Sequence, residues 1–309
     1  MSTLLFEDLN LSKEIFKAIK DMGFENPSEI QYKAIPLIMQ GNDIVGKSQT
    51  GTGKTVAFGV PSVEVIDSKI KKGIQVLILC PTRELAMQAC AEIKKIAKFK
   101  EGVKTAEVYG GASIEKQITK LKTANIVVGT PGRIMDHMRR KTLKLQNVKM
   151  VVLDEADEML SMGFIDDIEA ILTAIESEHQ TVLFSATMPK EIMELTRKFQ
   201  KSPKLVEVDK KKVTVSNIEQ SYYNVPMGRK MDALNLLLRY YNPIRSMIFC
   251  NTKRMVDEIT EYLTKHNFSV QGLHGDMKQS ARSQVMQSFR DGKIHVLVAT
   301  DVAARGIDV

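Results

Sequence analysis

Short, continuous apolar runs recur along the chain and are separated by longer amphipathic segments. Runs of this kind, rich in Leu and β-branched residues, are typical of strands buried on both faces of a parallel sheet. The helical patterns between them supply the crossovers that parallel strands require, so the alternation predicts a doubly wound α/β fold. In the first half, the expected strands are 76–79, 125–129, 150–154 and 181–185, and the expected helices include 82–98, 113–122, 164–176 and 190–199.

The same pattern begins again after a polar, basic segment, VDKKKVTVSN at 208–217. A chain of 309 residues is long enough for two domains, and this segment has no helical period. We therefore expect a domain at 1–207, a linker at 208–218 and a second, incomplete domain at 219–309. In the second half, the expected strands are 247–250, 268–273 and 295–300, and the expected helices are 228–241, 252–266 and 278–290.

Composition narrows the class of protein. Hydrophobic residues make up 43% of the chain and charged residues 26%, which is typical of a globular protein with a core. No apolar run approaches the ~18 residues that span a bilayer, and the N-terminus lacks a signal-peptide pattern, so we expect a cytoplasmic protein. The net charge of +7 permits a polyanionic partner but is also common among proteins without one. No cysteine pair has metal-ligand spacing, so reduced thiols are predicted at Cys80, Cys90 and Cys250.

A glycine-rich segment, SQTGTGKT at 48–55, lies between a short apolar run and a helical pattern. Such a loop aims backbone N–H groups and a helix dipole at phosphate. Lys54 would meet the β- and γ-phosphates of a nucleotide, and Thr55 would offer its hydroxyl to magnesium. A chance glycine-rich turn is the alternative, and the strict pattern has Gly where this chain has Ser48. The residues predicted to bind nucleotide are Ser48, Gln49, Thr50, Gly51, Thr52, Gly53, Lys54 and Thr55.

Two carboxylates, Asp154 and Glu155, follow the apolar run 150–153. At the end of a parallel strand they can face the same crevice as the phosphate loop. Asp154 would hold magnesium, directly or through water, and Glu155 would orient and deprotonate an attacking water. An acidic helix start is the alternative, since Asp and Glu favour a first helical turn. Lys54, Asp154 and Glu155 are thus the predicted catalytic residues.

The run Asp154-Glu155-Ala156-Asp157 resembles the tetrapeptide that names the DEAD-box helicases. The resemblance, in the style of the bacterial members, extends over nearly the whole chain. It implies two tandem RecA-like lobes, the second incomplete, that use ATP and magnesium to remodel RNA. The other blocks that carry it are GFENPSEIQ at 23–31, PTRELA at 81–86, Gly110-Gly111, TPGR at 130–133, SAT at 185–187, FCNT at 249–252, HGDMKQSAR at 274–282 and ATDVAARGID at 299–308.

The resemblance implies that Gln31 reads adenine, because an amide can donate and accept at once. Phe6 would stack on the base. The alternatives are an ordinary surface amide on the helix after Pro27 and a Phe that only pins the N-terminus. From the second lobe, Asp308 and Arg305 would face the ATP cleft.

RNA contacts are also implied by the resemblance, mainly to sugar and phosphate and therefore largely independent of sequence. Arginines at strand-to-helix junctions suit phosphate, and a glycine pair lets a backbone approach closely. Plain turn chemistry would explain the glycines but not two arginines at matched junctions. The expected RNA-binding residues are Pro81, Thr82, Arg83, Gly110, Gly111, Thr130, Pro131, Gly132, Arg133, Gly275, Arg282 and Thr300.

A third group is expected to couple the ATP state to strand separation. Ser185 and Thr187 would hydrogen-bond Asp157, and Arg305 would contribute from the second lobe. The alternative for the two hydroxyls is a cap for the helix at 190–199. His274 has no second histidine at metal-ligand spacing, so a metal site there is rejected.

The family's last motif, a His-Arg-x-Gly-Arg-x-x-Arg block, does not occur before the chain ends at Val309. Its arginines would act on the γ-phosphate, where such fingers are worth roughly 10³–10⁵ in turnover. We therefore expect a truncated chain. Two hypotheses remain: an ATP-dependent RNA helicase, or a nucleotide- and RNA-binding module with little turnover.

Overall fold

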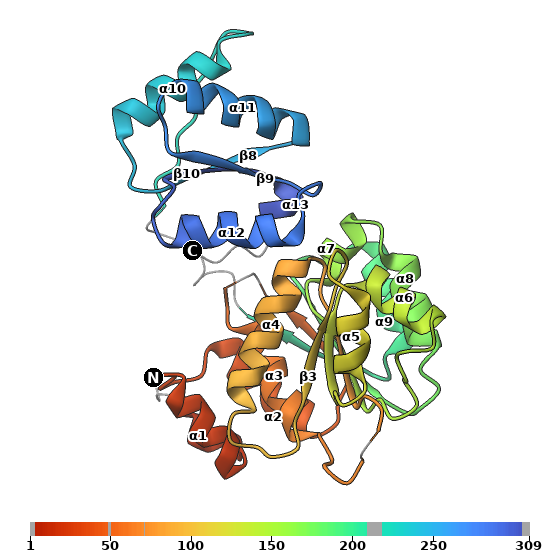
Figure 1. Cartoon of the computed structure of the whole chain (residues 1–309). Helices are drawn as coiled ribbons and strands as arrows, with labels where there is room; N and C mark the ends of the chain where they lie inside the picture. The colour runs from red at the N-terminus through yellow and green to blue at the C-terminus, as the bar shows by residue number, and fades with distance from the viewer. Residues whose placement is uncertain (1–3, 49–50, 71, 209–217, 305–309) are drawn as a thin grey trace. The chain divides into compact units, whose positions relative to one another are not determined.

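The computed structural model describes residues 4–48, 51–70, 72–208 and 218–304. The chain forms two compact units, Met1–Lys210 (unit 1) and Lys211–Val309 (unit 2), drawn in Figure 1. Each unit is built on a parallel sheet with helices packed against it, which confirms the predicted α/β class. The expected linker at 208–218 lies largely outside the described residues, and the lobe boundaries stay a prediction.

The sheet of unit 1 has seven parallel strands in the order β3-β4-β2-β5-β6-β1-β7. All four of the expected strands lie within it. The two edge strands, β3 and β7, were not predicted, because they bury only part of their residues and so form no continuous apolar run. The strands are β1 Ile44–Lys47, β2 Val76–Leu79, β3 Thr105–Val108, β4 Ile126–Gly129, β5 Met150–Leu153, β6 Gln180–Ser185 and β7 Lys204–Glu207.

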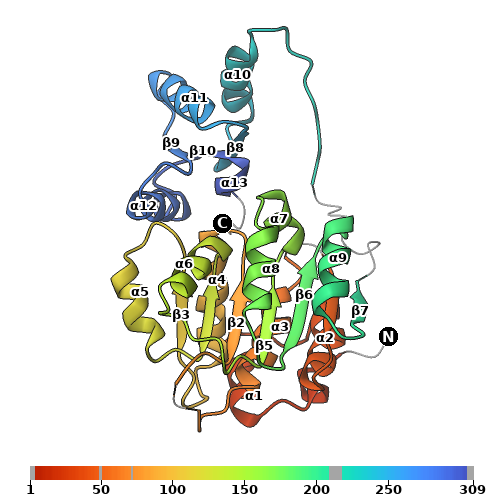
Figure 2. The ribbon, with the colours of Figure 1, turned by 90° about the vertical axis from the view of Figure 1, so that its right-hand side faces the viewer.

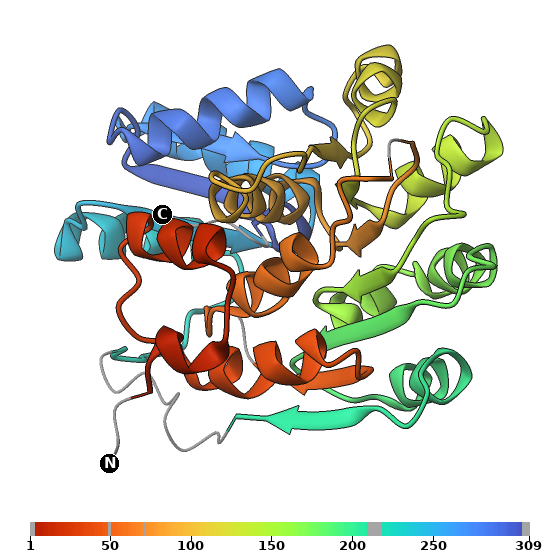
Figure 3. The same cartoon turned by 90° about the horizontal axis from the view of Figure 1, so that it is seen from below.

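Helices cover both faces of this sheet, as Figures 2 and 3 show. Successive strand residues point to opposite faces, so Val76 and Ile78 join one core and Leu77 and Leu79 the other. Helices α1 to α4 pack on the first core and α6 to α9 on the second. The helices are η1 Phe6–Leu9, α1 Lys13–Asp21, α2 Glu29–Met39, α3 Lys54–Glu64, α4 Arg83–Ile96, α5 Ile114–Leu121, α6 Pro131–Arg139, α7 Ala156–Ser161, α8 Ile165–Thr173 and α9 Lys190–Phe199.

The described residues of unit 2 form three parallel strands in the order β8-β10-β9. Helices α10 and α11 pack on one face of the sheet and α12 on the other. The strands are β8 Ser246–Cys250, β9 Val270–Leu273 and β10 Val296–Thr300, and the helices are α10 Lys230–Tyr241, α11 Lys253–Lys265, α12 Gln279–Arg290 and α13 Asp301–Ala304. After β10 the chain continues directly as the short helix α13.

The topology of unit 1 gathers the motifs that the sequence singled out. Because parallel strands end at the same edge of a sheet, the loops that follow them meet there. The phosphate loop follows β1, the glycine pair β3, and the acidic pair β5. PTR, TPGR and SAT follow β2, β4 and β6 in the same way. Within the described ranges, no helix is both long and apolar enough to cross a membrane.

Candidate functional site

The phosphate loop leads directly into α3, whose N-cap is Gly53 with a φ of +88°. A Cβ at this position would lie 2.4 Å from Nε2 of Gln31, so only glycine fits both the backbone conformation and the close approach. Lys54 is the first residue of the helix and is buried. Of the predicted loop residues, Gln49 and Thr50 lie outside the described residues.

Gln31 ties α2 to the phosphate loop. Its Nε2 donates to the carbonyl of Gly53 at 3.1 Å, and its Oε1 accepts from the backbone N–H of Ser28 at 2.9 Å. The Ser28 hydroxyl adds a second tie, donating to the carbonyl of Thr52 at 2.8 Å. With 4% of its surface exposed, Gln31 is not the surface amide of the alternative interpretation. Its role toward adenine stays a prediction.

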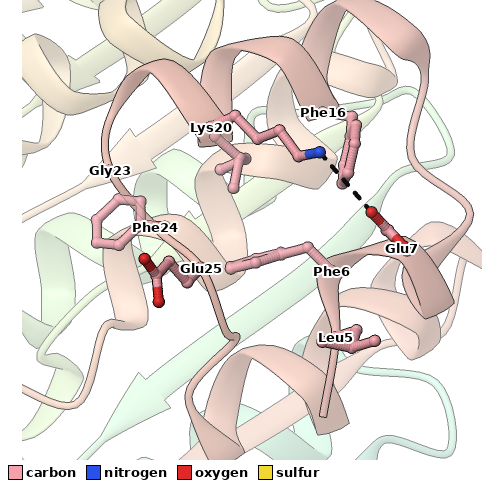
Figure 4. Close-up of a pocket in the computed structure, with 9 residues that line it drawn as sticks. Leu5, Phe6, Glu7, Phe16, Lys20, Gly23, Phe24 and Glu25 are labelled. Carbon is pink, nitrogen blue, oxygen red and sulfur yellow. Dashed lines mark ion pairs between the residues drawn. The ribbon is translucent and has the colours of Figure 1, made fainter. Parts of the chain in front are cut away.

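Phe6 borders a cavity of about 470 Å³ between η1, α1 and residues 23–25. Figure 4 shows its ring directed toward Phe24 and Glu25, with the Glu7–Lys20 ion pair at the rim. Phe6 is itself buried. An aromatic ring beside a cavity suits the stacking role, which stays a prediction.

Three charged side chains meet where the phosphate loop faces the end of β5. Nζ of Lys54 lies 3.9 Å from Oδ1 of Asp154 and 3.8 Å from Oε1 of Glu155. All three side chains are buried. These distances are long for direct salt bridges, which leaves room for groups that would bridge the three charges.

Burial shapes the electrostatics of this cluster. It raises the pKa of Asp154, against the pull of Lys54. Burial and the neighbouring Asp154 charge raise the pKa of Glu155 to about 7. Oδ1 of Asp154 is buried with no hydrogen-bond partner, as expected of an acceptor shaped for a cation or its bound water.

Glu155 has an unusual backbone. As the N-cap of α7 it adopts the left-handed conformation, with φ 54° and ψ 52°. Non-glycine residues in this region are uncommon and cluster at functional sites. The acidic helix start also holds, because Glu155 is the N-cap of α7 and Asp157 and Glu158 lie in its first turn.

Asp157 and Thr187 link the ends of β5 and β6. The hydroxyl and backbone N–H of Thr187 donate to Oδ2 of Asp157 at 2.8 and 2.9 Å. Although partial burial opposes it, hydrogen bonds from Thr187 and Ser185 hold the pKa of Asp157 below its usual value. The capping alternative is wrong, because α9 has Pro189 as its N-cap and no side-chain cap. The coupling role of these residues stays a prediction.

On the other side of the sheet edge, Arg83 lies against the glycine pair. A Cβ at Gly111, whose φ is +82°, would lie 2.4 Å from Nη1 of Arg83. Thr82 caps α4, since its hydroxyl accepts from the N–H of Leu85 at 3.3 Å. The structure therefore brings Arg83 and both glycines together.

Arg133 points back into the protein. Its Nη1 donates to the carbonyl of Ala112 at 3.1 Å and to Oε1 of Gln117 at 3.2 Å. Arg133 therefore supports the turn that holds Gly110 and Gly111, and its expected contact with phosphate stays a prediction. The sequence analysis did not single out Gln117. The one sequence signal for it is a polar residue on the buried side of the helix α5. Thr130, Pro131 and Gly132 form the start of α6 beside it.

The predicted residues of unit 2 are less closely gathered. Gly275 is exposed, Arg282 is buried on α12, and the Thr300 hydroxyl accepts from the N–H of Ala303 at 3.3 Å. His274 Nε2 lies 3.2 Å from Oδ1 of Asp257. Arg305 and Asp308 lie outside the described residues.

A phosphate loop facing an acidic pair across the carboxyl edge of a parallel sheet defines a P-loop nucleotide-binding protein of the RecA-like class. The family model for DEAD/DEAH box helicases matches residues 28–195, and the model for the helicase conserved C-terminal domain matches residues 229–309. The chain belongs to the DEAD/DEAH box helicase family, as the resemblance predicted.

Known proteins agree with this assignment. A DEAD-box ATP-dependent RNA helicase, CshA of Bacillus subtilis, is 49% identical over 99% of this chain and 62% of its own length. The Geobacillus kaustophilus CshA is 50% identical, over 98% and 65%. The chain thus spans somewhat less than two thirds of these relatives.

Solved structures of the family show the same fold. A DEAD box protein from Methanococcus jannaschii is 45% identical to this chain, with a TM-score of 0.65. The match covers 100% of this chain and 83% of the Methanococcus jannaschii chain. Saccharomyces cerevisiae Dbp5, bound to RNA and ADP BeF3, is 32% identical, with a TM-score of 0.88. That match covers 99% of this chain and 78% of the Dbp5 chain. These likenesses confirm two RecA-like lobes in this chain.

Proposed function

We propose that this chain carries the ATP-hydrolysing and RNA-binding machinery of an ATP-dependent RNA helicase, which remodels or locally unwinds RNA. The observation that supports this most is the buried meeting point of Lys54, Asp154 and Glu155 beside the phosphate loop. Relatives named as RNA helicases, and a family structure bound to RNA and ADP BeF3, support the choice of ligands.

Thr55 and Asp154 are the residues that would hold magnesium with ATP. Among the described residues, no group of three or more acidic, His or Cys side chains could hold a metal by itself, so the nucleotide would have to supply ligands. When bound, magnesium would neutralise charge on the β- and γ-phosphates. Lys54 would place its ammonium against the same oxygens, and the N–H groups of the loop would orient them.

Glu155 would act as the base. A base works best when its pKa lies near the working pH, and burial beside Asp154 brings the pKa of Glu155 to about 7. The left-handed backbone conformation of Glu155 sets the direction in which its side chain leaves the end of β5. Glu155 would take a proton from the water that attacks the γ-phosphate.

Residues around the other loops of the same sheet edge would bind RNA through sugar and phosphate. Arg83 and the Gly110-Gly111 turn lie in contact there, which supports their assignment. Asp157 and Thr187 connect the loop after β5, which carries Glu155, to the loop after β6. That connection is a physical route by which the nucleotide state could alter the neighbouring loop.

A second candidate is a nucleotide- and RNA-binding module with little turnover. The observation that favours it is coverage: the chain spans 62% of the length of the Bacillus subtilis helicase, so the activity of that whole protein is not carried over to it. The two candidates differ in one measurable rate, that of ATP hydrolysis. A cytoplasmic location stays a prediction for both.

The test is ATP hydrolysis by the 309-residue chain with magnesium, with and without single-stranded RNA. Hydrolysis that rises with RNA and is lost in Lys54→Ala identifies the helicase chemistry. Tight ATP and RNA binding without stimulated hydrolysis selects the binding module. RNA affinity should fall steeply with salt and vary only a few-fold between sequences of equal length. Absence of ATP binding would refute both candidates.

A further inference from the structure

Behind the Gly110-Gly111 turn lies a row of buried polar side chains that the proposed chemistry does not use. The turn joins β3 to α5. Gln117 on α5 is 4% exposed, and His137 on α6 is fully buried. Such side chains are unfavourable in an interior unless they are hydrogen-bonded, so their partners show what they do.

Gln117 contacts the turn through its amide nitrogen. Nε2 donates to the backbone carbonyl of Tyr109, the residue before the glycine pair, at 2.9 Å. Its Oε1 accepts from Nη1 of Arg133 at 3.2 Å and lies 3.0 Å from Nε2 of His137. A single amide therefore joins the turn to two side chains of α6.

Arg133 contacts the turn from its other end. Nη1 also donates to the carbonyl of Ala112, the residue after the glycine pair, at 3.1 Å. The carbonyls on both sides of Gly110-Gly111 are thus held by side chains. The glycines have no side chains of their own to restrict them, so these two hydrogen bonds limit the shape of the turn.

The chemistry of His137 follows from its partners. Oε1 of Gln117 can only accept, so Nε2 of His137 must carry the hydrogen. In the neutral ring Nδ1 is an acceptor, 2.8 Å from the Thr142 hydroxyl, whose one hydrogen can go to Nδ1 or to the backbone carbonyl of His137 at 3.1 Å. Burial, together with the charge of Arg133, lowers the pKa of His137, which favours that neutral form. His137 is therefore a fixed donor that orients the Gln117 amide.

We infer that Gln117 and His137 are positioning residues for RNA binding. They fix Arg133 and the two carbonyls that flank the Gly110-Gly111 turn, and so hold the turn in shape for a sugar–phosphate backbone. The inference rests on the proposed RNA-binding function. Because Gly111 packs on Arg83, a change in the turn would reach that side chain as well.

Four variants test this inference. Gln117→Leu and His137→Leu remove the hydrogen bonds at similar volume. His137→Gln returns an N–H near the position of Nε2 and should rescue. Gln75→Leu is the matched control: Gln75 is equally buried in the same unit, and its amide bonds only the backbone N–H and carbonyl of Asp67, both at 2.9 Å. Gln75 lies just before β2, at the amino end of the strand, whereas the Gly110-Gly111 turn lies at the carboxyl ends of the strands.

Two readouts separate positioning from general stability. The first is the affinity for a labelled single-stranded RNA, measured by fluorescence anisotropy beside the affinity for ATP. We expect RNA binding to weaken roughly fivefold to tenfold in both leucine variants, which corresponds to about one net hydrogen bond, with ATP affinity unchanged. The second is amide hydrogen exchange over residues 109–113, which should speed up in the same variants.

His137→Gln should bind RNA within about twofold of the wild type, and Gln75→Leu should match the wild type in both readouts. Where a leucine variant does not fold, Gln117→Glu keeps the acceptors for Arg133 and His137, loses the donor to Tyr109 and adds a negative charge beside Arg133, with faster exchange at the turn expected. Wild-type RNA affinity and exchange in the Gln117 and His137 variants would overturn the inference, and so would an equal loss in Gln75→Leu. A wild-type chain that binds no RNA would instead overturn the proposed function, and the inference with it.

Discussion

Units 1 and 2 use the same kind of apolar strand but bury it to different extents. In unit 1, β2, β4 and β5 have neighbours on both sides and every residue buried. Among the described residues of unit 2, β8 pairs with a strand on one side only, and Phe249 is 58% exposed. Of the fifteen large apolar side chains exposed among the described residues, ten lie in unit 2.

The difference teaches that an apolar run predicts a strand but not its burial, which depends on how many neighbours the strand has. The two units also differ in how many charged side chains they bury. Unit 1, whose central strands are fully buried, also buries Lys54, Asp154 and Glu155, whereas Arg282 is the one charged side chain buried among the described residues of unit 2. Buried charges need a rigid surround that keeps their partners in place.

The largest expected effect tests whether turnover depends on the acidic pair of unit 1. Glu155→Gln keeps the shape of the side chain and removes the base, so ATP hydrolysis should fall by about 10²–10⁴ while ATP binding survives. The matched control in unit 2 is Glu261→Gln, an exposed glutamate paired with Lys265. Steady-state hydrolysis and nucleotide titration check both variants. Equal loss of binding and turnover in Glu155→Gln would remove Glu155 from the role of base.

A pair of core truncations asks whether the units unfold separately. Phe184 packs against Phe58 in unit 1, and Phe289 lies in the core of unit 2. Each change to alanine should cost about 3–5 kcal/mol. Phe184→Ala should speed hydrogen exchange in residues 4–208 only, and Phe289→Ala in residues 218–304 only. Faster exchange throughout the chain in either variant would show one cooperative unit.

A pH series sharpens the comparison of buried charge. The pKa of Glu155 is about 7 in the folded chain, above the value of 4.5 expected when unfolded. The folded state therefore holds a proton that the unfolded state releases, so this group lowers stability as pH rises from about 4.5 to 7. Relative to the wild type, Glu155→Gln should gain up to roughly 3 kcal/mol over that range. Denaturant unfolding at pH 5 and pH 8 measures it, and an equal difference at both would contradict the buried-carboxylate account.

The smallest expected effect concerns choice of nucleotide. Gln31→Ala removes both the proposed adenine contact and the tie to Gly53, so ATP affinity should fall about tenfold and GTP affinity less. Ser28→Ala removes the hydrogen bond from its hydroxyl to Thr52 and the Ser28 half of the capping box of α2, and should weaken ATP and GTP equally, by a few-fold. Competition titrations give both ratios. A wild-type chain that binds the two nucleotides equally would end the adenine assignment.

Much of the fold could be predicted from the chain alone. Runs such as 76–79 and 150–153 are apolar throughout because their strands are buried on both faces, and they were predicted almost to the residue. The edge strands β3 and β7 were missed, since TAEV and KLVE alternate or expose most of their side chains. A four-residue strand that is buried on one side only has too few apolar residues to be recognised from the sequence.

The site was predictable in its residues and less so in its contacts. The phosphate loop and the acidic pair have fixed spacing, which the sequence displays directly. The tie from Gln31 to Gly53 spans 22 residues, and the contact of Arg133 with Ala112 spans 21. Such contacts depend on how loops meet at the sheet edge, and a single sequence carries no pattern for them.

The left-handed backbone at Glu155 places activity and stability in opposition at one position. Glycine there would relieve about 1 kcal/mol of backbone strain and would also remove a carboxylate that burial disfavours. Both changes would strengthen the fold and abolish the proposed base. A library of variants selected only for heat resistance should therefore lose Glu155 early, whereas one selected for ATP turnover should keep it. The residue found at position 155 would therefore indicate whether a set of variants had been selected for stability or for ATP turnover.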